Sequence, residues 1–368
     1  MKIYLTHYRT ASTTYTELLE DIAYPQRVHW FPELYARAKT GMFYVPHKLA
    51  EKVLDPVLMQ EIRENKVGKT AFILAGGNAH FAGINQRPAP DNRLNYIYKF
   101  LPFTLTQVYA GRTAQMFGDV DYITTDASAC ASSLKALMDV QTMIKFYGYD
   151  RVIVLSVEDA ISNTVLEFFG ESNASLNESK KVEQNIEPSA FDSKNQGFYV
   201  GQGAVLAVFE SERARSAIGH AMLMSAFSAS ESSTNAIGQL ENGEGYGKAI
   251  KGALALADAL PEDIKIVKTH GTGTESNNKA EKAALEGIPD FIATSYKQKI
   301  GHTMGASGLL ETCLLLDDMK SGIVPKIENR TEKDNVFLSD DTKAPSGYIL
   351  SLAAGMGNIY SAAILEAI

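Results

Sequence analysis

The stretch Thr124-Thr125-Asp126-Ala127-Ser128-Ala129-Cys130-Ala131-Ser132-Ser133-Leu134 joins a strand-like run, residues 121–124, to an apolar helical pattern over residues 131–146. Cys130 therefore stands at the start of a helix, where the positive end of the helix dipole favours a thiolate. Cysteines in such settings have pKa values of roughly 3.5–7.5, against about 8.5 for a free thiol. The small neighbouring side chains leave the sulfur open to a bulky substrate. We predict that Cys130 is a nucleophile with a lowered pKa, and the alternative is a buried, inert cysteine.

Strand-like and helical patterns alternate along the chain, which predicts an α/β fold with helices packed on sheets. Apolar runs typical of buried strands occupy residues 71–75, 151–157 and 203–209, and helical periodicity covers residues 131–146, 247–259 and 308–319. The segment Cys130-Ala131-Ser132-Ser133-Leu134 is echoed by Gly305-Ala306-Ser307-Gly308-Leu309, which opens another apolar helix. Two such helix starts suit a duplicated βαβ architecture, although three matches in five positions also fit coincidence.

The composition narrows the classes of function. The chain has 368 residues, 45% of them hydrophobic, enough for roughly two domain-sized units. Its net charge of −8 argues against non-specific nucleic-acid binding. The N-terminus has no apolar signal core and no apolar run reaches 18 residues, so we expect a cytoplasmic protein without a membrane span. The two cysteines, Cys130 and Cys313, form no CxxC pair, which makes a disulfide framework or a zinc site unexpected. Cys313 lies inside an apolar run and fits a buried, inert cysteine.

Two histidines each follow a strand-like run. His270 lies in Lys268-Thr269-His270-Gly271-Thr272-Gly273-Thr274, directly after residues 264–267. A phosphate loop is a poor alternative there, because no Lys-Ser/Thr pair follows the glycines. A plain turn histidine is the more serious alternative. His302 lies in Lys297-Gln298-Lys299-Ile300-Gly301-His302, after the run 291–294. For this second histidine an ordinary surface loop is the alternative.

Taken together, the three motifs resemble the elongating β-ketoacyl synthases, the acyl-carrier-protein condensing enzymes of fatty-acid and polyketide synthesis. Cys130 matches the family's nucleophile, His270 the histidine of His-Gly-Thr-Gly-Thr, and His302 the histidine of Lys-x-x-x-Gly-His. Lys297 falls on the motif lysine and Glu281 on the glutamate eleven residues after the first histidine. Residues 190–192 and 197–204 resemble two further family segments. The resemblance covers roughly residues 70 to 365 in the family's order.

The resemblance implies a thiolase-like fold of two βαβ-rich halves in five layers, usually assembled as a dimer. We expect residues 1–210 to form the half that carries Cys130 and residues 211–368 to form the half that carries both histidines. The partners it implies are an acyl carrier protein and a second synthase subunit, in a homodimer or a heterodimer.

The resemblance also implies a reaction. Cys130 would take an acyl chain from a carrier-protein thioester, and malonyl-carrier protein would then lose carbon dioxide and condense with that chain. His270 and His302 would stabilise the enolate, and Lys297 and Glu281 would form a supporting ion pair. Backbone N–H groups of Cys130 and of a glycine-rich loop near the C-terminus would stabilise the oxyanion. The reaction needs no metal or nucleotide cofactor, because phosphopantetheine of the carrier protein presents the substrates.

The sequence departs from the family at several points. Met356, in Gly355-Met356-Gly357, stands where the family has a gating phenylalanine, and methionine is the more flexible side chain. Gln202 replaces a usual glutamate and Asn278 a usual aspartate. These departures suggest a specialised polyketide or polyene pathway.

Two other functions fit part of the same pattern. A non-catalytic partner subunit of the chain-length-factor type resembles this family but lacks the nucleophile. A synthase-like acyltransferase would use the cysteine to move acyl groups without decarboxylation. The cysteine argues against the first alternative and the two histidines argue against the second.

Overall fold

The computed structural model describes residues 1–12, 52–77, 106–158, 160, 163–172, 174–176, 185–233, 235 and 237–368. Within these ranges a 10-stranded mixed sheet has the order β3-β2-β4-β5-β1-β6-β12-β11-β7-β8, and β9 pairs with β10. The N-terminal strands are β1 (Ile3–Ser12), β2 (Thr70–Ala75), β3 (Tyr122–Asp126), β4 (Arg151–Glu158) and β5 (Gly203–Ser211). The C-terminal strands are β6 (Ala221–Ser230), β7 (Ile264–Lys268), β8 (Ile292–Thr294), β9 (Ile323–Val324), β10 (Thr342–Lys343), β11 (Tyr348–Gly355) and β12 (Ile359–Ala367).

The two halves of the large sheet repeat one topology. In the first half β3, β2 and β4 are parallel, whereas β5 and β1 continue the sheet antiparallel. In the second half β8, β7 and β11 are parallel, and β12 and β6 continue antiparallel. The halves join where β1 meets β6, at Tyr4 opposite Met222 and Leu5 opposite Ala221. The repeat confirms the expected duplication. The predicted boundary between residues 210 and 211 falls at the end of β5 and stays a prediction.

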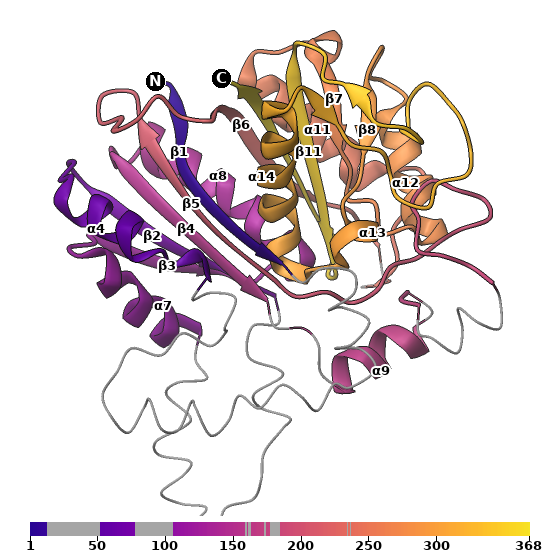
Figure 1. The fold of residues 1–368 in the computed structure, drawn as a ribbon, viewed down its shortest axis with the longest axis horizontal. Coiled ribbons are helices and arrows are strands. Elements are labelled where there is room, and N and C mark those ends of the chain that lie inside the picture. The colour runs from indigo at the N-terminus through magenta and orange to yellow at the C-terminus, as the bar shows by residue number, and fades with distance from the viewer. Residues whose placement is uncertain are drawn as a thin grey trace, which may run out of the picture.

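Helices lie between the two halves and on both outer faces (Figure 1). The central pair contacts both halves, since α8 touches β4 and β6 and α14 touches β5 and β11. On the outer face of the first half, α4 and α7 share a hydrophobic core with β2, β4 and β5. On the outer face of the second half, α11 and α12 pack on β7, β11 and β12. The result is the expected succession of five layers. The α-helices are α4 (Pro56–Glu64), α7 (Thr106–Ala114), α8 (Ser132–Lys145), α9 (Asn163–Glu171), α11 (Glu244–Ala257), α12 (Glu275–Leu285), α13 (Lys297–Ile300) and α14 (Ser307–Lys320), and the 3-10 turns are η2 (Gln115–Phe117), η3 (Ala129–Ala131), η4 (Pro261–Asp263) and η5 (Met304–Ala306).

The layered packing explains why β2, β4 and β5 can be recognised in the sequence as apolar runs. Every residue of β2, β4 and β5 is buried, because helices cover both faces of this part of the sheet. Such strands are largely apolar on both faces rather than alternating. The three helices expected at residues 131–146, 247–259 and 308–319 are α8, α11 and α14, with ends within three residues of the prediction. Among the described residues, no helix is long and apolar enough to cross a bilayer.

The sequence echo around Cys130 and Gly305 is a structural repeat. Each segment forms a 3-10 turn, η3 or η5, that leads into a central helix of 14 residues. The residue at the start of each turn, Ala129 or Met304, has a positive φ, of 49° and 42° respectively. The two turns contact each other, so the starts of both central helices meet at one place.

Candidate active site

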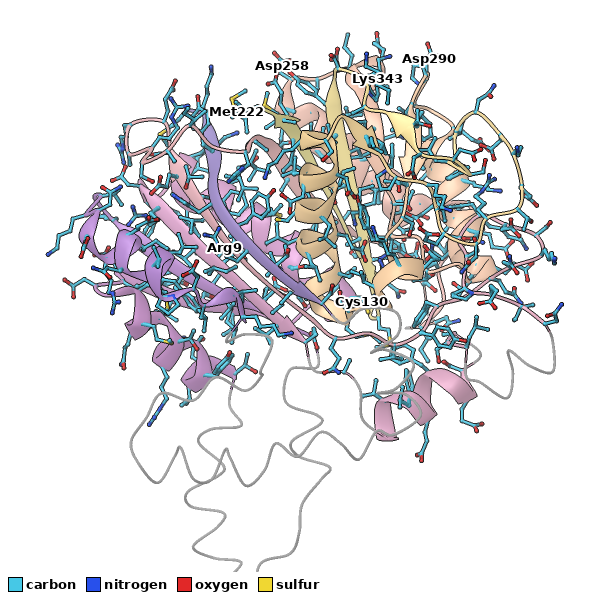
Figure 2. All side chains as sticks on the ribbon, in the orientation of Figure 1. Arg9, Cys130, Met222, Asp258, Asp290 and Lys343 are labelled. Atoms are coloured by element: carbon cyan, nitrogen blue, oxygen red, sulfur yellow. The ribbon has the colours of Figure 1, made fainter. Side chains whose placement is uncertain are left out.

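Cys130 lies in a sharp turn between β3 and α8, where the two halves of the molecule meet (Figure 2). Ala129 reaches a left-handed φ of 49°, a conformation that costs a non-glycine residue of the order of 1–3 kcal/mol. Ser132 Oγ stabilises the turn by donating to the Ala129 carbonyl at 2.6 Å. The thiol is 6% exposed, and its Sγ lies 3.9 Å from Met304 Sδ.

Burial raises the pKa of the Cys130 thiol to about 12, and the nearby Glu158 carboxylate contributes to the rise. Lys297 acts in the opposite direction, but its effect is smaller. The prediction of a lowered pKa is therefore wrong. The helix dipole acts only at the helix start, whereas burial of the thiol between the two halves of the sheet has the larger effect on its pKa. The thiol needs a proton acceptor to become a nucleophile.

His270 follows β7 in a turn that one carboxylate holds. Glu281 accepts the backbone N–H groups of His270 and Gly271, at 2.6 and 2.8 Å. Asn277 donates its side-chain amide to the same carboxylate at 2.7 Å. Gly271 has a φ of 58°, and a Cβ there would overlap Ser295 Oγ, so the tight turn requires glycine.

His302 is placed by two backbone hydrogen bonds to the segment after Phe198. Its N–H donates to the Tyr199 carbonyl at 2.7 Å, and its carbonyl accepts the Gly201 N–H at 2.9 Å. The ring of His302 packs edge-on to Phe198, with 5.0 Å between centroids. Phe198 belongs to the same buried cluster as Cys130 and Met304. This packing places His302 against the buried cluster that contains Cys130.

The rings of the two histidines lie edge to face. Their ring centroids are 5.5 Å apart at an interplanar angle of 81°. Burial is the main reason that the pKa of each lies well below 6.5, and the cations Lys297 and Lys268 lower both further. Each imidazole is therefore neutral near pH 7. Neither Nδ1 atom has a hydrogen-bond partner among the described residues.

The supporting residues pair differently from the prediction. Lys297 binds Glu311 of α14, with Nζ 2.8 Å from Oε1, and both side chains are fully buried. Glu281 binds the backbone of the His270 turn instead, so the predicted Lys297–Glu281 ion pair is wrong. Lys268 Nζ reaches the other oxygen of Glu311 at 3.3 Å. Glu311 is a residue that the motifs missed, although it is the single carboxylate in the apolar run 309–316, which is a signal that such a partner exists.

The loop around Met356 adjoins the cysteine turn. Met356 packs against the hydrophobic cluster that contains Cys130. A Cβ on Gly355 would overlap the Ser128 carbonyl oxygen and crowd Ala131, so this glycine allows the loop to touch the turn. Gly357 has a φ of 86° and open space around its Cα. The loop and the Cys130 turn are therefore neighbours, as expected. A gating role for Met356 stays a prediction.

Glu158 is a further polar residue beside Cys130. Glu158, at the end of β4, is fully buried and accepts the Gly77 N–H. A Cβ on Gly305 would meet the Glu158 carboxylate and the Ala129 carbonyl, which places Glu158 at the meeting point of η3 and η5. Of the two departures noted in the sequence, Gln202 is buried, and the buried Asn278 Oδ1 has no partner among the described residues.

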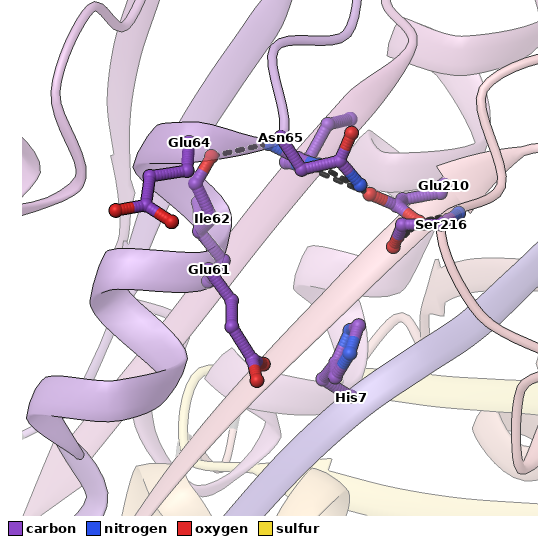
Figure 3. A pocket seen from close by; sticks show the side chains of 8 residues that line it. His7, Glu61, Ile62, Glu64, Asn65, Glu210 and Ser216 are labelled. Carbon is purple, nitrogen blue, oxygen red and sulfur yellow. Dashed lines mark hydrogen bonds and ion pairs between the residues drawn. The ribbon is translucent and has the colours of Figure 1, made fainter.

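A separate pocket lies at the other end of β4. It has a volume of about 410 Å³ and lies between β1, α4 and the far ends of β4 and β5 (Figure 3). Arg151, which begins β4, binds the buried Glu210 there at 2.7 Å. Glu158, near the cysteine, ends the same strand. This pocket is therefore distinct from the cysteine–histidine centre.

Comparisons with known proteins agree with this arrangement. The family described as "Beta-ketoacyl synthase, N-terminal domain" matches residues 57–214, and "Beta-ketoacyl synthase, C-terminal domain" matches residues 214–331. A putative polyketide beta-ketoacyl synthase 1 from Streptomyces cyaneus is 27% identical over 278 residues, which are 72% of this chain. The match spans 64% of the length of that relative.

Solved structures share the fold over the whole chain. A type II PKS acyl-carrier protein in complex with its ketosynthase bound to the hexaketide (AntDE:AntF) matches with a TM-score of 0.78 and 17% identity, covering 100% of this chain and 99% of that one. A ketosynthase in complex with its chain length factor from Xenorhabdus doucetiae matches with a TM-score of 0.73 and 18% identity, covering 100% and 98%. At these identities the likeness concerns the fold alone, and it confirms the expected thiolase-like architecture.

Proposed function

This chain belongs to the β-ketoacyl synthase family, and we propose that it catalyses the decarboxylative Claisen condensation of an acyl-cysteine with malonyl-acyl carrier protein. The product is a β-ketoacyl-carrier protein. The observation that supports the proposal is a chain of contacts: the rings of His270 and His302 lie edge to face, and His302 packs on Phe198, which shares a buried cluster with Cys130. The reaction needs no metal or nucleotide, since both substrates arrive as phosphopantetheine thioesters.

The first step transfers an acyl group to Cys130. Because the pKa of the thiol is about 12, the proton must leave as the sulfur attacks the thioester carbonyl. A neutral imidazole of the histidine pair accepts this proton, which is the usual activation of a cysteine by histidine. The carrier's phosphopantetheine thiolate departs and takes up a proton, and the acyl chain stays on the sulfur.

The second step generates the carbon nucleophile. When malonyl thioester loses carbon dioxide, negative charge develops on the thioester oxygen. His270 and His302, each neutral, present one N–H donor apiece to that oxygen in a site without bulk water. Donors of this kind are worth about 10²–10³ in rate each. The Nδ1 atoms have no partner among the described residues, which leaves the N–H free to be carried on Nε2.

The third step forms the new carbon–carbon bond. The enolate carbon attacks the acyl-cysteine carbonyl, whose oxygen becomes an oxyanion. The backbone N–H of Cys130 and that of Met356 are the donors proposed for it. The close packing of Gly355 on Ser128 and Ala131 supports this assignment, because it brings the loop to the cysteine turn. Collapse of the tetrahedral intermediate breaks the carbon–sulfur bond and returns Cys130.

The proposed partners are an acyl carrier protein and a second synthase subunit. The structural relatives include one ketosynthase in complex with a carrier protein and one in complex with a chain length factor. We infer that this chain assembles likewise, as a homodimer or as the catalytic member of a heterodimer. The catalytic role is favoured over a chain-length-factor role because the cysteine and both histidines are present together.

The test separates acylation from decarboxylation. Intact-mass analysis after incubation with acyl-carrier proteins should show an acyl adduct on the wild type and none on Cys130→Gln. Carbon-dioxide release from malonyl-carrier protein should persist in Cys130→Gln and fall about 10²-fold or more in His270→Ala and in His302→Ala. The matched controls are Cys313→Ala and His220→Ala, which lie outside the site and should behave as wild type.

Each alternative function predicts a different pattern. If both histidine variants release carbon dioxide at the wild-type rate, the chain is an acyltransferase. If the wild type, with its partner subunit present, shows neither adduct nor carbon dioxide, the chain is a non-catalytic partner and the proposal fails.

A further inference from the structure

Two buried lysines share one buried carboxylate behind the histidine pair. Glu311 on α14 has Lys297 Nζ at 2.8 Å from Oε1 and Lys268 Nζ at 3.3 Å from Oε2. All three side chains have 0% exposure. Among the described residues, Glu311 is the one ion-pair partner of both lysines, and Glu281 is the further carboxylate whose charge acts on them.

Lys268 is fixed in this position by the fold. It is the last residue of β7, two positions before His270, and its Nζ also donates to the Leu352 carbonyl of β11 at 2.8 Å. The side chain therefore stays in the core and does not extend to solvent. The ionisable groups that face Lys268 are Glu311 from α14, Lys297 from α13 and Glu281 from α12, with His270 and His302 in the adjoining segments.

A positive charge in a dry interior affects its ionisable neighbours. Adding an imidazolium to a site that already holds two buried lysines is unfavourable, because like charges repel strongly at low dielectric. Lys268 and Lys297 both act in this direction on both histidines. Burial lowers the pKa of Lys268 itself to about 8, so below that pH it carries its proton. The charge is thus present over the mildly acidic range in which a histidine would otherwise be protonated.

We propose that Lys268 is a positioning residue that, by sharing Glu311 with Lys297, keeps a second positive charge beside His270 and His302 and so holds both as neutral imidazoles. The inference rests on the proposed function in one respect, since a neutral imidazole is needed there to accept the Cys130 proton. Removal of Lys268 leaves a balanced Lys297–Glu311 pair, and protonation of a histidine then becomes easier.

The first experiment measures the protonation of the two imidazoles directly and does not depend on catalytic activity. The full chain carries ¹⁵N-labelled histidine, and the resonances of His270 and His302 are assigned with the single alanine variants. In the wild type both rings should stay neutral down to pH 5.5. In Lys268→Met both titration midpoints should rise by about one pH unit. Lys279→Met, which removes an exposed lysine from α12, is the matched control and should shift neither midpoint.

A second readout follows the pH dependence of carbon-dioxide release. In Lys268→Met the acid limb of the profile should move to higher pH, while the rate at the optimum stays within about threefold of wild type. A purely structural role would lower the rate equally at every pH. If Lys268→Met does not fold, the wild-type titration still decides, because a wild-type His270 or His302 that protonates above pH 6 overturns the inference. Unchanged midpoints in a folded Lys268→Met also overturn it. If the histidines behave as expected and no carbon dioxide is released, the proposed function fails and the inference about Lys268 stands.

Discussion

Glu281 controls His270 through the backbone, because its carboxylate accepts the His270 N–H at 2.6 Å. The second oxygen takes the next N–H of the chain, that of Gly271, at 2.8 Å. A fully buried carboxylate that accepts two successive N–H groups fixes the direction in which the chain continues after β7. That direction sets where the His270 side chain points. The orientation of the histidine therefore depends on a residue eleven positions further along the chain.

Glu281→Gln should disorder this turn. An amide offers one acceptor oxygen, and its NH₂ group faces a backbone N–H, so at least one buried donor loses its partner. Such a loss costs roughly 1–3 kcal/mol. We expect a lower melting temperature and a fall of about tenfold or more in carbon-dioxide release from malonyl-carrier protein. Glu275→Gln, an exposed residue of the same helix, is the control. Equal melting and equal rates in both variants would show that the two hydrogen bonds do not position His270.

Gly355→Ala should separate the C-terminal loop from the cysteine turn. The added methyl group would overlap the Ser128 carbonyl, which is backbone and cannot rotate away. We expect a loss of stability of roughly 1–3 kcal/mol and loss of the acyl adduct at Cys130 by mass analysis. Gly111→Ala in α7 has open space around it and should be neutral or slightly stabilising. Full acylation of a stable Gly355→Ala would mean that the contact is dispensable for the nucleophile.

Alkylation of Cys130 should depend steeply on pH. Its pKa is raised to about 12, so the thiolate fraction increases about tenfold for each pH unit below that value. Limiting iodoacetamide should label Cys130 faster at pH 9 than at pH 7 and should abolish condensation. Cys313, fully buried in α14, should not be labelled in the native protein. A rate that levels off near pH 7 would instead indicate an acidic thiol, and preferential labelling of Cys313 would refute the assignment of the nucleophile.

The layers of this fold could be predicted from local patterns, because each pattern has a direct physical cause. The apolar runs at residues 71–75 and 152–155 are unbroken, since helices cover both faces of β2 and β4. The three motifs predict one site. The rings of His270 and His302 are in contact, and His302 packs on Phe198, which shares a buried cluster with Cys130, whereas a joint catalytic role of the three stays a prediction. Residue types and their order along the chain were sufficient for that inference.

Partners and pKa values could not be predicted in the same way. Lys297 could have paired with any carboxylate that the fold brings near, and spacing along the sequence did not distinguish Glu281 from Glu311. The pKa of Cys130 depends on how deeply the start of α8 is buried between the sheet halves, which is a property of the assembled layers. For that reason the helix dipole alone predicts the wrong direction for the pKa shift of Cys130.

Met356→Phe should restrict the acyl chains that the site accepts. Met356 packs on the hydrophobic cluster around Cys130, and Gly355 and Gly357 on either side permit the backbone to move. Methionine has three rotatable side-chain bonds, so it adapts to different chains, whereas a phenylalanine ring is rigid. The variant should fold normally and keep acylation at Cys130, because the Met356 side chain is not the proposed oxyanion donor. In a competition between acyl carriers of several lengths, we expect a narrower range of products or slower condensation than in wild type. Identical profiles and rates would show that residue 356 is not a gate, and the proposed role of the loop would have to be abandoned.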